Sequence, residues 1–132
     1  DMVIIMLGTN DLKHRFGKSA WDIAEGMAAL ATITRSAAAG RNGGAPEVIL
    51  VSPPPILRKL PGFEDLFEGA YAKSQDMAKR YQAVADRLGI RFFDAGKVAK
   101  SGKADGFHLD PEAHAALGRA LALELNRLKL PG

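Results

Sequence analysis

Residues 2–7 read MVIIML and are followed by the polar tetrad GTND at 8–11. A continuous apolar run rich in β-branched residues and closed by a glycine is typical of a strand buried on both faces, as in a parallel sheet. Residues 47–51, EVILV, repeat this pattern, and residues 90–93, IRFF, repeat it more weakly. The sequence therefore predicts three strands, each followed by polar or glycine-rich chain.

Helical patterns separate these runs. Ser19 with Asp22 three residues later is a capping-box pattern, which predicts the start of a helix. Asp110 followed by Pro111 predicts another start, because aspartate caps the first turn and proline fits the first helical position. Apolar residues recur at near-helical spacing in three stripes: Ile23, Met27, Leu30 and Ile33; Met77, Tyr81, Val84 and Leu88, with Gly89 as the expected stop; and Leu117, Leu121, Leu125 and Leu128.

The resulting β-α-β-α-β-α order is typical of an α/β fold. We expect three α/β/α layers around a flavodoxin-like parallel sheet. In sheets with the strand order 2-1-3-4-5, the central strands come early in the sequence. This chain begins at Asp1, directly before an apolar strand. We therefore expect residues 1–132 to be the C-terminal part of a single domain and to supply its last three strands and helices.

Composition narrows the function classes. The chain has 132 residues, 47% apolar and 25% charged, which is ordinary for a globular domain. Its net charge of +3 comes from scattered Lys and Arg, so we expect no nucleic-acid partner. The chain has no cysteine, which excludes disulfides and thiolate chemistry within it. No apolar run approaches the roughly 18 residues of a membrane span, so we expect no membrane partner.

The segment ADGFHL at 104–109 follows the third strand and holds the first candidate catalytic pair. A carboxylate at Asp105 can fold back across Gly106 to accept a hydrogen bond from the His108 imidazole. Such a pair would fix the tautomer and leave Nε2 as a general base, as in a Ser-His-Asp triad. The spacing D-x-x-H also fits an ordinary turn before a helix, with both side chains solvated.

Asn10, at the end of the first strand, is the second candidate. Polar groups beyond the carboxyl ends of parallel strands are where α/β folds bind ligands. A side-chain amide there can donate a hydrogen bond to a developing oxyanion. The alternative is a turn residue, since Asn and Asp are favoured wherever a strand leads into a loop.

Taken together, GTND after a strand and DGFH before the last helix resemble the SGNH (GDSL-type) hydrolase family, in its arylesterase and acyltransferase branch. The phrases VILVSPPP, FEGAYAKS and RFFDAG extend the resemblance over almost the whole chain. It implies that Asn10 is the oxyanion-hole amide and that Asp105 and His108 are the acid and base of a triad. It also implies that Gly8 lets the chain turn tightly and that Asp11 stabilises the loop.

The chain departs from that family in its nucleophile. The family carries its serine in a Gly-Asp-Ser block after the first strand, and no such block occurs here. None of the available serines has that setting: Ser19, Ser36, Ser52, Ser74 and Ser101. We expect the nucleophile in an upstream segment and this chain alone to be inactive.

The function predicted on this basis is hydrolysis of short-chain carboxylic esters, with acyl transfer to alcohols as a further outcome. It requires no cofactor and no metal. The expected partners are a small-molecule ester, the complementary N-terminal segment and, as the resemblance implies, further copies in a homo-oligomer. The alternatives are a non-catalytic flavodoxin-like binding module and an inactive fragment. A cytoplasmic location is expected, with a signal peptide left open because it would lie upstream.

Two further features have open interpretations. The long connection at 53–70 follows a strand end, where such segments shape pockets or interfaces. Trp21, Phe63 and Phe67 could be pocket walls or subunit contacts, although large aromatic residues most often fill a core or an interface. His14 could line the substrate mouth or lie on the plain surface.

Overall fold

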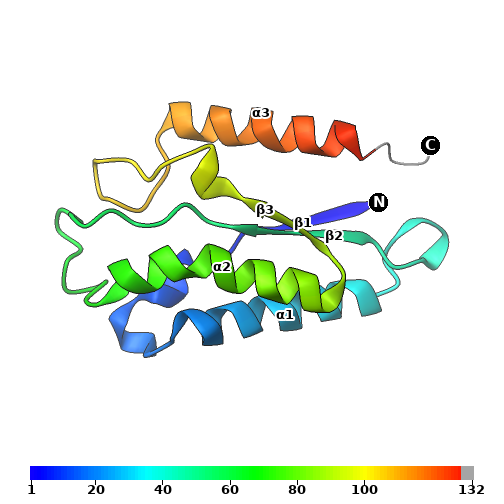
Figure 1. The fold of residues 1–132 in the computed structure, drawn as a ribbon, viewed down its shortest axis with the longest axis horizontal. Coiled ribbons are helices and arrows are strands. Elements are labelled where there is room, and N and C mark those ends of the chain that lie inside the picture. The colour runs from blue at the N-terminus through cyan, green and yellow to red at the C-terminus, as the bar shows by residue number, and fades with distance from the viewer. Residues whose placement is uncertain (129–132) are drawn as a thin grey trace.

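The computed structural model describes residues 1–128 (Figure 1). Within that range three parallel strands form one sheet, in the order β1 (Met2–Ile5), β2 (Glu47–Ser52) and β3 (Arg91–Asp94). The register pairs Ile5 with Leu50 and Ser52 with Asp94. All three strands therefore point their carboxyl ends to the same edge of the sheet.

Helices cover both faces of this sheet. In Figure 1, α1 (Ala20–Ser36) and α2 (Ala70–Leu88) lie on one face and α3 (Pro111–Arg127) lies on the other. Short 3₁₀ segments complete the chain: η1 (Thr9–Leu12), η2 (His14–Phe16), η3 (Arg41–Gly43) and η4 (Ala95–Lys97). The predicted three-layer α/β/α fold with a parallel sheet is confirmed.

The central strand β2 divides the core into two. Because side chains alternate along a strand, Val48 and Leu50 pack with α1 and α2, whereas Ile49 and Val51 pack with α3. All four side chains are at most 2% exposed. Full burial of such a side chain stabilises the fold by about 1.5–3 kcal/mol, so β2 is the main hydrophobic anchor of both layers.

Strand β1 is shorter and more exposed than its sequence predicts. It ends at Ile5 rather than at residue 7, and Val3 and Ile4 are 36% and 41% exposed. The physical reason is its place in the sheet, since β1 pairs only with β2 and its other edge has no strand within residues 1–128. The expectation of burial on both faces is therefore wrong for this strand in the described chain.

Helix α1 begins where the capping box predicts, but the face that it buries differs from the predicted apolar stripe. The Asp22 amide donates to Ser19 Oγ at 3.1 Å, and the Ser19 amide donates to Asp22 Oδ2 at 2.8 Å. Ile23 and Met27 are buried as predicted, but Leu30 and Ile33 are 37% and 64% exposed. Alanines take the remaining buried positions, namely Ala20, Ala24, Ala28 and Ala31. These small side chains let α1 approach the sheet and α2 closely.

The other two helices follow their predicted stripes. Met77, Tyr81 and Val84 of α2 are buried, and Gly89 ends the helix at φ +62°. Asp110 caps α3 by accepting a hydrogen bond from the Ala113 amide at 2.8 Å. In α3, Leu117 is buried, and Leu121, Leu125 and Leu128 are partly buried against the sheet. Within residues 1–128 no helix is both long and apolar enough to cross a bilayer.

We predict that Leu50→Ala lowers the free energy of unfolding by about 2–5 kcal/mol, because it opens a cavity where Leu50 is fully buried. Leu123→Ala is the matched control, since Leu123 is 62% exposed on α3; its expected effect is below about 0.5 kcal/mol. Urea unfolding of both variants tests the prediction. Equal losses would contradict the assignment of β2 as the core strand.

Candidate active site

Polar groups gather where the strands end. Ser52 and Asp94 are paired in register at the ends of β2 and β3, and the Ser52 hydroxyl lies 3.3 Å from Asp94 Oδ1. The same carboxylate oxygen accepts a hydrogen bond from the Gly96 amide at 2.9 Å. These contacts fix the carboxyl edge of the sheet from which the candidate catalytic loops extend.

Asp105 and His108 form a hydrogen-bonded pair in the loop between η4 and α3. Asp105 Oδ2 lies 2.6 Å from His108 Nδ1. The other carboxylate oxygen accepts backbone hydrogen bonds from His108 at 2.9 Å and from Phe107 at 3.0 Å. One side chain therefore folds the turn and orients the imidazole at the same time.

Gly106 allows this turn to form. Its φ is +89°, a backbone conformation that residues other than glycine rarely adopt. A Cβ at this position would also run into the carbonyl oxygen of Lys59. The Leu57 amide donates to the Gly106 carbonyl at 2.8 Å, so the Asp105–His108 turn is built directly against the connection at 53–69.

Electrostatics favours a charged Asp105 beside an oriented imidazole. The backbone N–H groups of His108 and Phe107, followed by the His108 ring, lower the pKa of the Asp105 carboxyl from 3.8 to about 2. A carboxylate only accepts hydrogen bonds, so His108 Nδ1 carries the proton in this pair and a neutral ring keeps Nε2 as its basic nitrogen. The His108 side chain is 73% exposed, so a reacting group can approach it.

Asn10 lies within η1, beyond the end of β1 at Ile5. Gly8, with φ +118°, directly precedes η1, and the Asp11 amide donates to the Gly8 carbonyl at 3.0 Å. Asn10 is exposed, and its side chain makes no hydrogen bond to another residue in the range 1–128. Its carboxamide therefore has a donor available for a ligand.

The connection at 53–69 contacts the Asp105–His108 turn and the chain just beyond η1. The His14 amide, in η2, donates to the Leu66 carbonyl of this connection at 2.9 Å. Phe107 packs against Phe67 with 4.8 Å between ring centroids and against the His108 ring with 4.2 Å. Asn10 lines a hollow between β1 and α1, and His108 does not line that hollow.

The candidate aromatic residues and His14 differ in how close they lie to the Asp105–His108 turn. Phe67 is buried in the core, and Phe63 is 37% exposed and packs edge-on against Phe107. Trp21 is 55% exposed on α1. The His14 ring is also exposed and lies 3.8 Å from the Glu68 carboxylate. Only the two phenylalanines adjoin the Asp105–His108 turn.

No serine hydroxyl of the chain is hydrogen bonded to His108; all of them lie in the range 1–128. The Ser19 hydroxyl caps α1. The buried hydroxyls of Ser74 and Ser101 donate to the carbonyls of Tyr71 and Pro55, and Ser52 is engaged with Asp94. The observed contacts therefore assign structural roles to these four serines.

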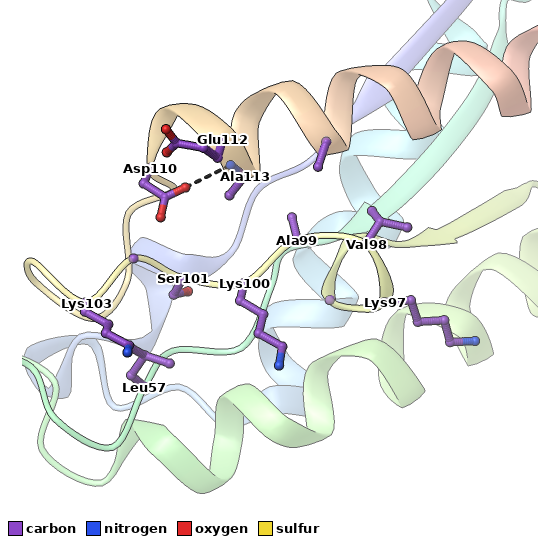
Figure 2. A pocket seen from close by; sticks show the side chains of 13 residues that line it. Leu57, Lys97, Val98, Ala99, Lys100, Ser101, Lys103, Asp110, Glu112 and Ala113 are labelled. Carbon is purple, nitrogen blue, oxygen red and sulfur yellow. Dashed lines mark hydrogen bonds between the residues drawn. The ribbon is translucent and has the colours of Figure 1, made fainter.

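A hollow of about 680 Å³ adjoins the Asp105–His108 turn, because Leu57, Gly102 and Asp110 belong to its lining. Figure 2 shows it between the segment containing Ala99 and Ser101 and the start of α3, where Asp110 already caps the helix. Neither His108 nor Asn10 lines it. Its lining offers no pair of groups arranged for acid–base chemistry.

Two other kinds of site find no support in the described chain. The glycine-rich segment Gly40–Gly44 forms the turn before β2, at the amino end of the sheet. A phosphate cradle would instead connect a strand end to a helix start. No group of three potential metal ligands occurs within residues 1–128.

Comparisons with known proteins show which family and which solved structures the chain is similar to. The profile of the GDSL-like lipase/acylhydrolase family matches residues 1–116. The solved structure of Est24, a carbohydrate acetylesterase from Sinorhizobium meliloti, is 40% identical to the chain, with a TM-score of 0.90. The native aryl esterase of M. smegmatis is 41% identical, with the same TM-score. For each, the alignment covers 97% of this chain and 61% of the solved chain.

A more distant structure shares the fold. The GDSL-like lipase from Bacteroides thetaiotaomicron VPI-5482 is 22% identical, with a TM-score of 0.73 over 98% of this chain and 63% of that chain. A comparison with curated proteins gave no match. The chain thus spans 61% of the length of the first two solved structures.

The Asp105 carboxylate should make stability depend on pH. Folding lowers the pKa of the Asp105 carboxyl to about 2. Its contribution to the free energy of unfolding is therefore complete above the unfolded-state pKa near 3.8, and it is lost as the pH falls through about 2. The difference in unfolding free energy between the wild type and Asp105→Asn should therefore shrink between pH 5 and pH 2. Urea titrations at several pH values measure it. A constant difference would contradict the assignment.

Proposed function

Because the chain belongs to the GDSL-like lipase/acylhydrolase family, we propose that it forms the C-terminal part of a serine esterase acting on short-chain carboxylic esters. The observation that carries this proposal is the Asp105–His108 hydrogen bond of 2.6 Å, together with the 73% exposure of the His108 side chain. A histidine with one nitrogen fixed by a carboxylate and the other accessible is arranged for general acid–base catalysis.

The descriptions of the two similar solved structures support the proposed substrate class. One is described as a carbohydrate acetylesterase and the other as an aryl esterase. What their descriptions share is an ester bond, whereas the alcohol differs. For this chain we propose esters with a short acyl group, with an aromatic alcohol or a sugar as the leaving group.

The proposed nucleophile is a serine supplied by an upstream segment. Two observations support this: the chain spans 61% of those solved structures, and four of its five serines already have structural roles. The upstream segment would complete the single domain and would also be the chain's principal partner, and the resemblance suggests a homo-oligomer. Without that upstream serine, residues 1–132 would be inactive alone.

The reaction then proceeds in two halves. The serine oxygen attacks the ester carbonyl while His108 Nε2 takes its proton, and the carbonyl oxygen becomes an oxyanion. The Asn10 amide donates a hydrogen bond to that oxyanion. The tetrahedral intermediate collapses, the alcohol leaves with the proton from His108, and an acyl-enzyme remains. Water, or a second alcohol in a transfer reaction, repeats the sequence and frees the serine.

We predict that His108→Ala lowers kcat by roughly 10⁴-fold or more, because the serine loses its base. The measurement is steady-state hydrolysis of p-nitrophenyl acetate by the protein containing this chain and its upstream segment. His114→Ala is the matched control, since His114 is exposed on α3, and it should retain activity within about twofold. Wild-type activity in His108→Ala would remove the proposed base.

Asn10→Ala should lower kcat on the order of 100-fold with little change in KM, because its amide binds the oxyanion and not the ground-state ester. Asn126→Ala on α3 provides the asparagine control and should behave as the wild type in the same assay. An Asn10→Ala variant with a raised KM and an unchanged kcat would show that Asn10 binds the ground-state substrate instead.

A further inference from the structure

Tyr81 has a buried polar group that the mechanism above leaves without a role. It lies on α2, its side chain is 0% exposed, and its hydroxyl donates to the Leu7 carbonyl at 2.8 Å. Leu7 is the residue just before the Gly8 turn. The hydrogen bond therefore joins the middle of α2 to the point where the chain leaves β1 for the loop that carries Asn10.

Gly8 and Tyr81 fit each other closely. A Cβ at position 8 would meet the Tyr81 hydroxyl directly, and it would approach Met77 Cε to 2.8 Å and Ile23 Cγ2 to 3.0 Å. The absence of a side chain at Gly8 thus makes room for the phenol. In the same place, α2 packs against η1, the turn that holds Asn10.

The helix that carries Tyr81 is firmly held. Arg87 of α2 forms an ion pair with Glu25 of α1 at 2.8 Å, and Arg35 of α1 donates to the Leu88 carbonyl at 2.9 Å. The phenol also stays a donor over the working pH range, because burial, and secondarily the Asp11 carboxylate, raise the pKa of Tyr81. Tyr81 is therefore a buried phenol that keeps its proton over that pH range, on a helix that packs against α1.

We propose that Tyr81 is a positioning residue that holds the 8–12 loop so that the Asn10 amide points at the developing oxyanion, a role that rests on the esterase function proposed above. Because η1 is short and Asn10 is exposed, the backbone must set the direction of its amide. A donor displaced by about 1 Å can cost 100-fold in rate. The Leu7 carbonyl is the one backbone group of the 7–12 segment that Tyr81 holds by a hydrogen bond.

A double-mutant cycle tests this proposal in the protein containing this chain and its upstream segment. Tyr81→Phe keeps the ring and removes only the hydroxyl, and we expect it to lower kcat about tenfold with KM within about twofold. In the Asn10→Ala background the same substitution should cost less than about twofold, because its effect passes through Asn10. Tyr71→Phe is the matched control on the same helix and should leave kcat unchanged.

A second measurement does not depend on activity. Tyr81→Phe should speed hydrogen exchange at the Asp11 amide, which donates to the Gly8 carbonyl, and Tyr71→Phe should leave that rate as in the wild type. An undiminished tenfold loss in the Asn10→Ala background, or unchanged exchange at Asp11, would overturn the positioning role. If Asn10→Ala alone leaves kcat unchanged, the oxyanion assignment fails instead, whatever the exchange data show.

Discussion

The central strand β2 is packed on both faces and paired along both edges, and this constraint places the polar groups of the candidate site. Its alternating side chains hold α1 and α2 on one face and α3 on the other. Parallel pairing with β1 and β3 then brings the ends of all three strands to one edge. Asn10 follows one of those ends and the Asp105–His108 turn follows another, although 98 residues separate Asn10 from His108 along the chain.

At that edge, polar groups are positioned mainly by backbone hydrogen bonds. Asp105 accepts two backbone N–H groups with one oxygen and the His108 ring with the other. The turn that orders the carboxylate therefore also orders the imidazole, and charge-assisted hydrogen bonds of this kind are about twice as strong as neutral ones. The connection at 53–69 supports this turn through Gly106 and Phe107 and reaches the chain beyond η1 through Leu66.

Much of the fold is predictable from local sequence because its signals are local. The Ser19 and Asp110 caps and the Gly89 stop each depend on residues within one helical turn, and all three are confirmed. The exposure of Leu30 and Ile33 was not predicted, because it depends on how closely the alanine face of α1 approaches its neighbours. The edge position of β1 likewise depends on which strands are its neighbours, and its own apolar run does not contain that information.

The candidate site is predictable only in part for the same reason. D-x-x-H spacing allows both an Asp105–His108 contact and an ordinary turn with solvated side chains, and the structure has the contact. Helical periodicity identifies Tyr81 as a core residue, but it gives no sign that the hydroxyl reaches Leu7, 74 residues away. The contacts of the 53–69 connection with the Asp105–His108 turn and with His14 are tertiary, and local patterns do not specify them.

The central claim is that His108 and Asn10 serve one reaction centre. The most direct test is a crystal structure of the protein containing this chain and its upstream segment after reaction with a p-nitrophenyl phosphonate ester. The account predicts a phosphonylated serine, with Asn10 Nδ2 about 2.7–3.1 Å from the phosphonyl oxygen and His108 Nε2 within hydrogen-bond reach of the serine oxygen. An adduct that contacts neither residue, or no adduct at all, would contradict it.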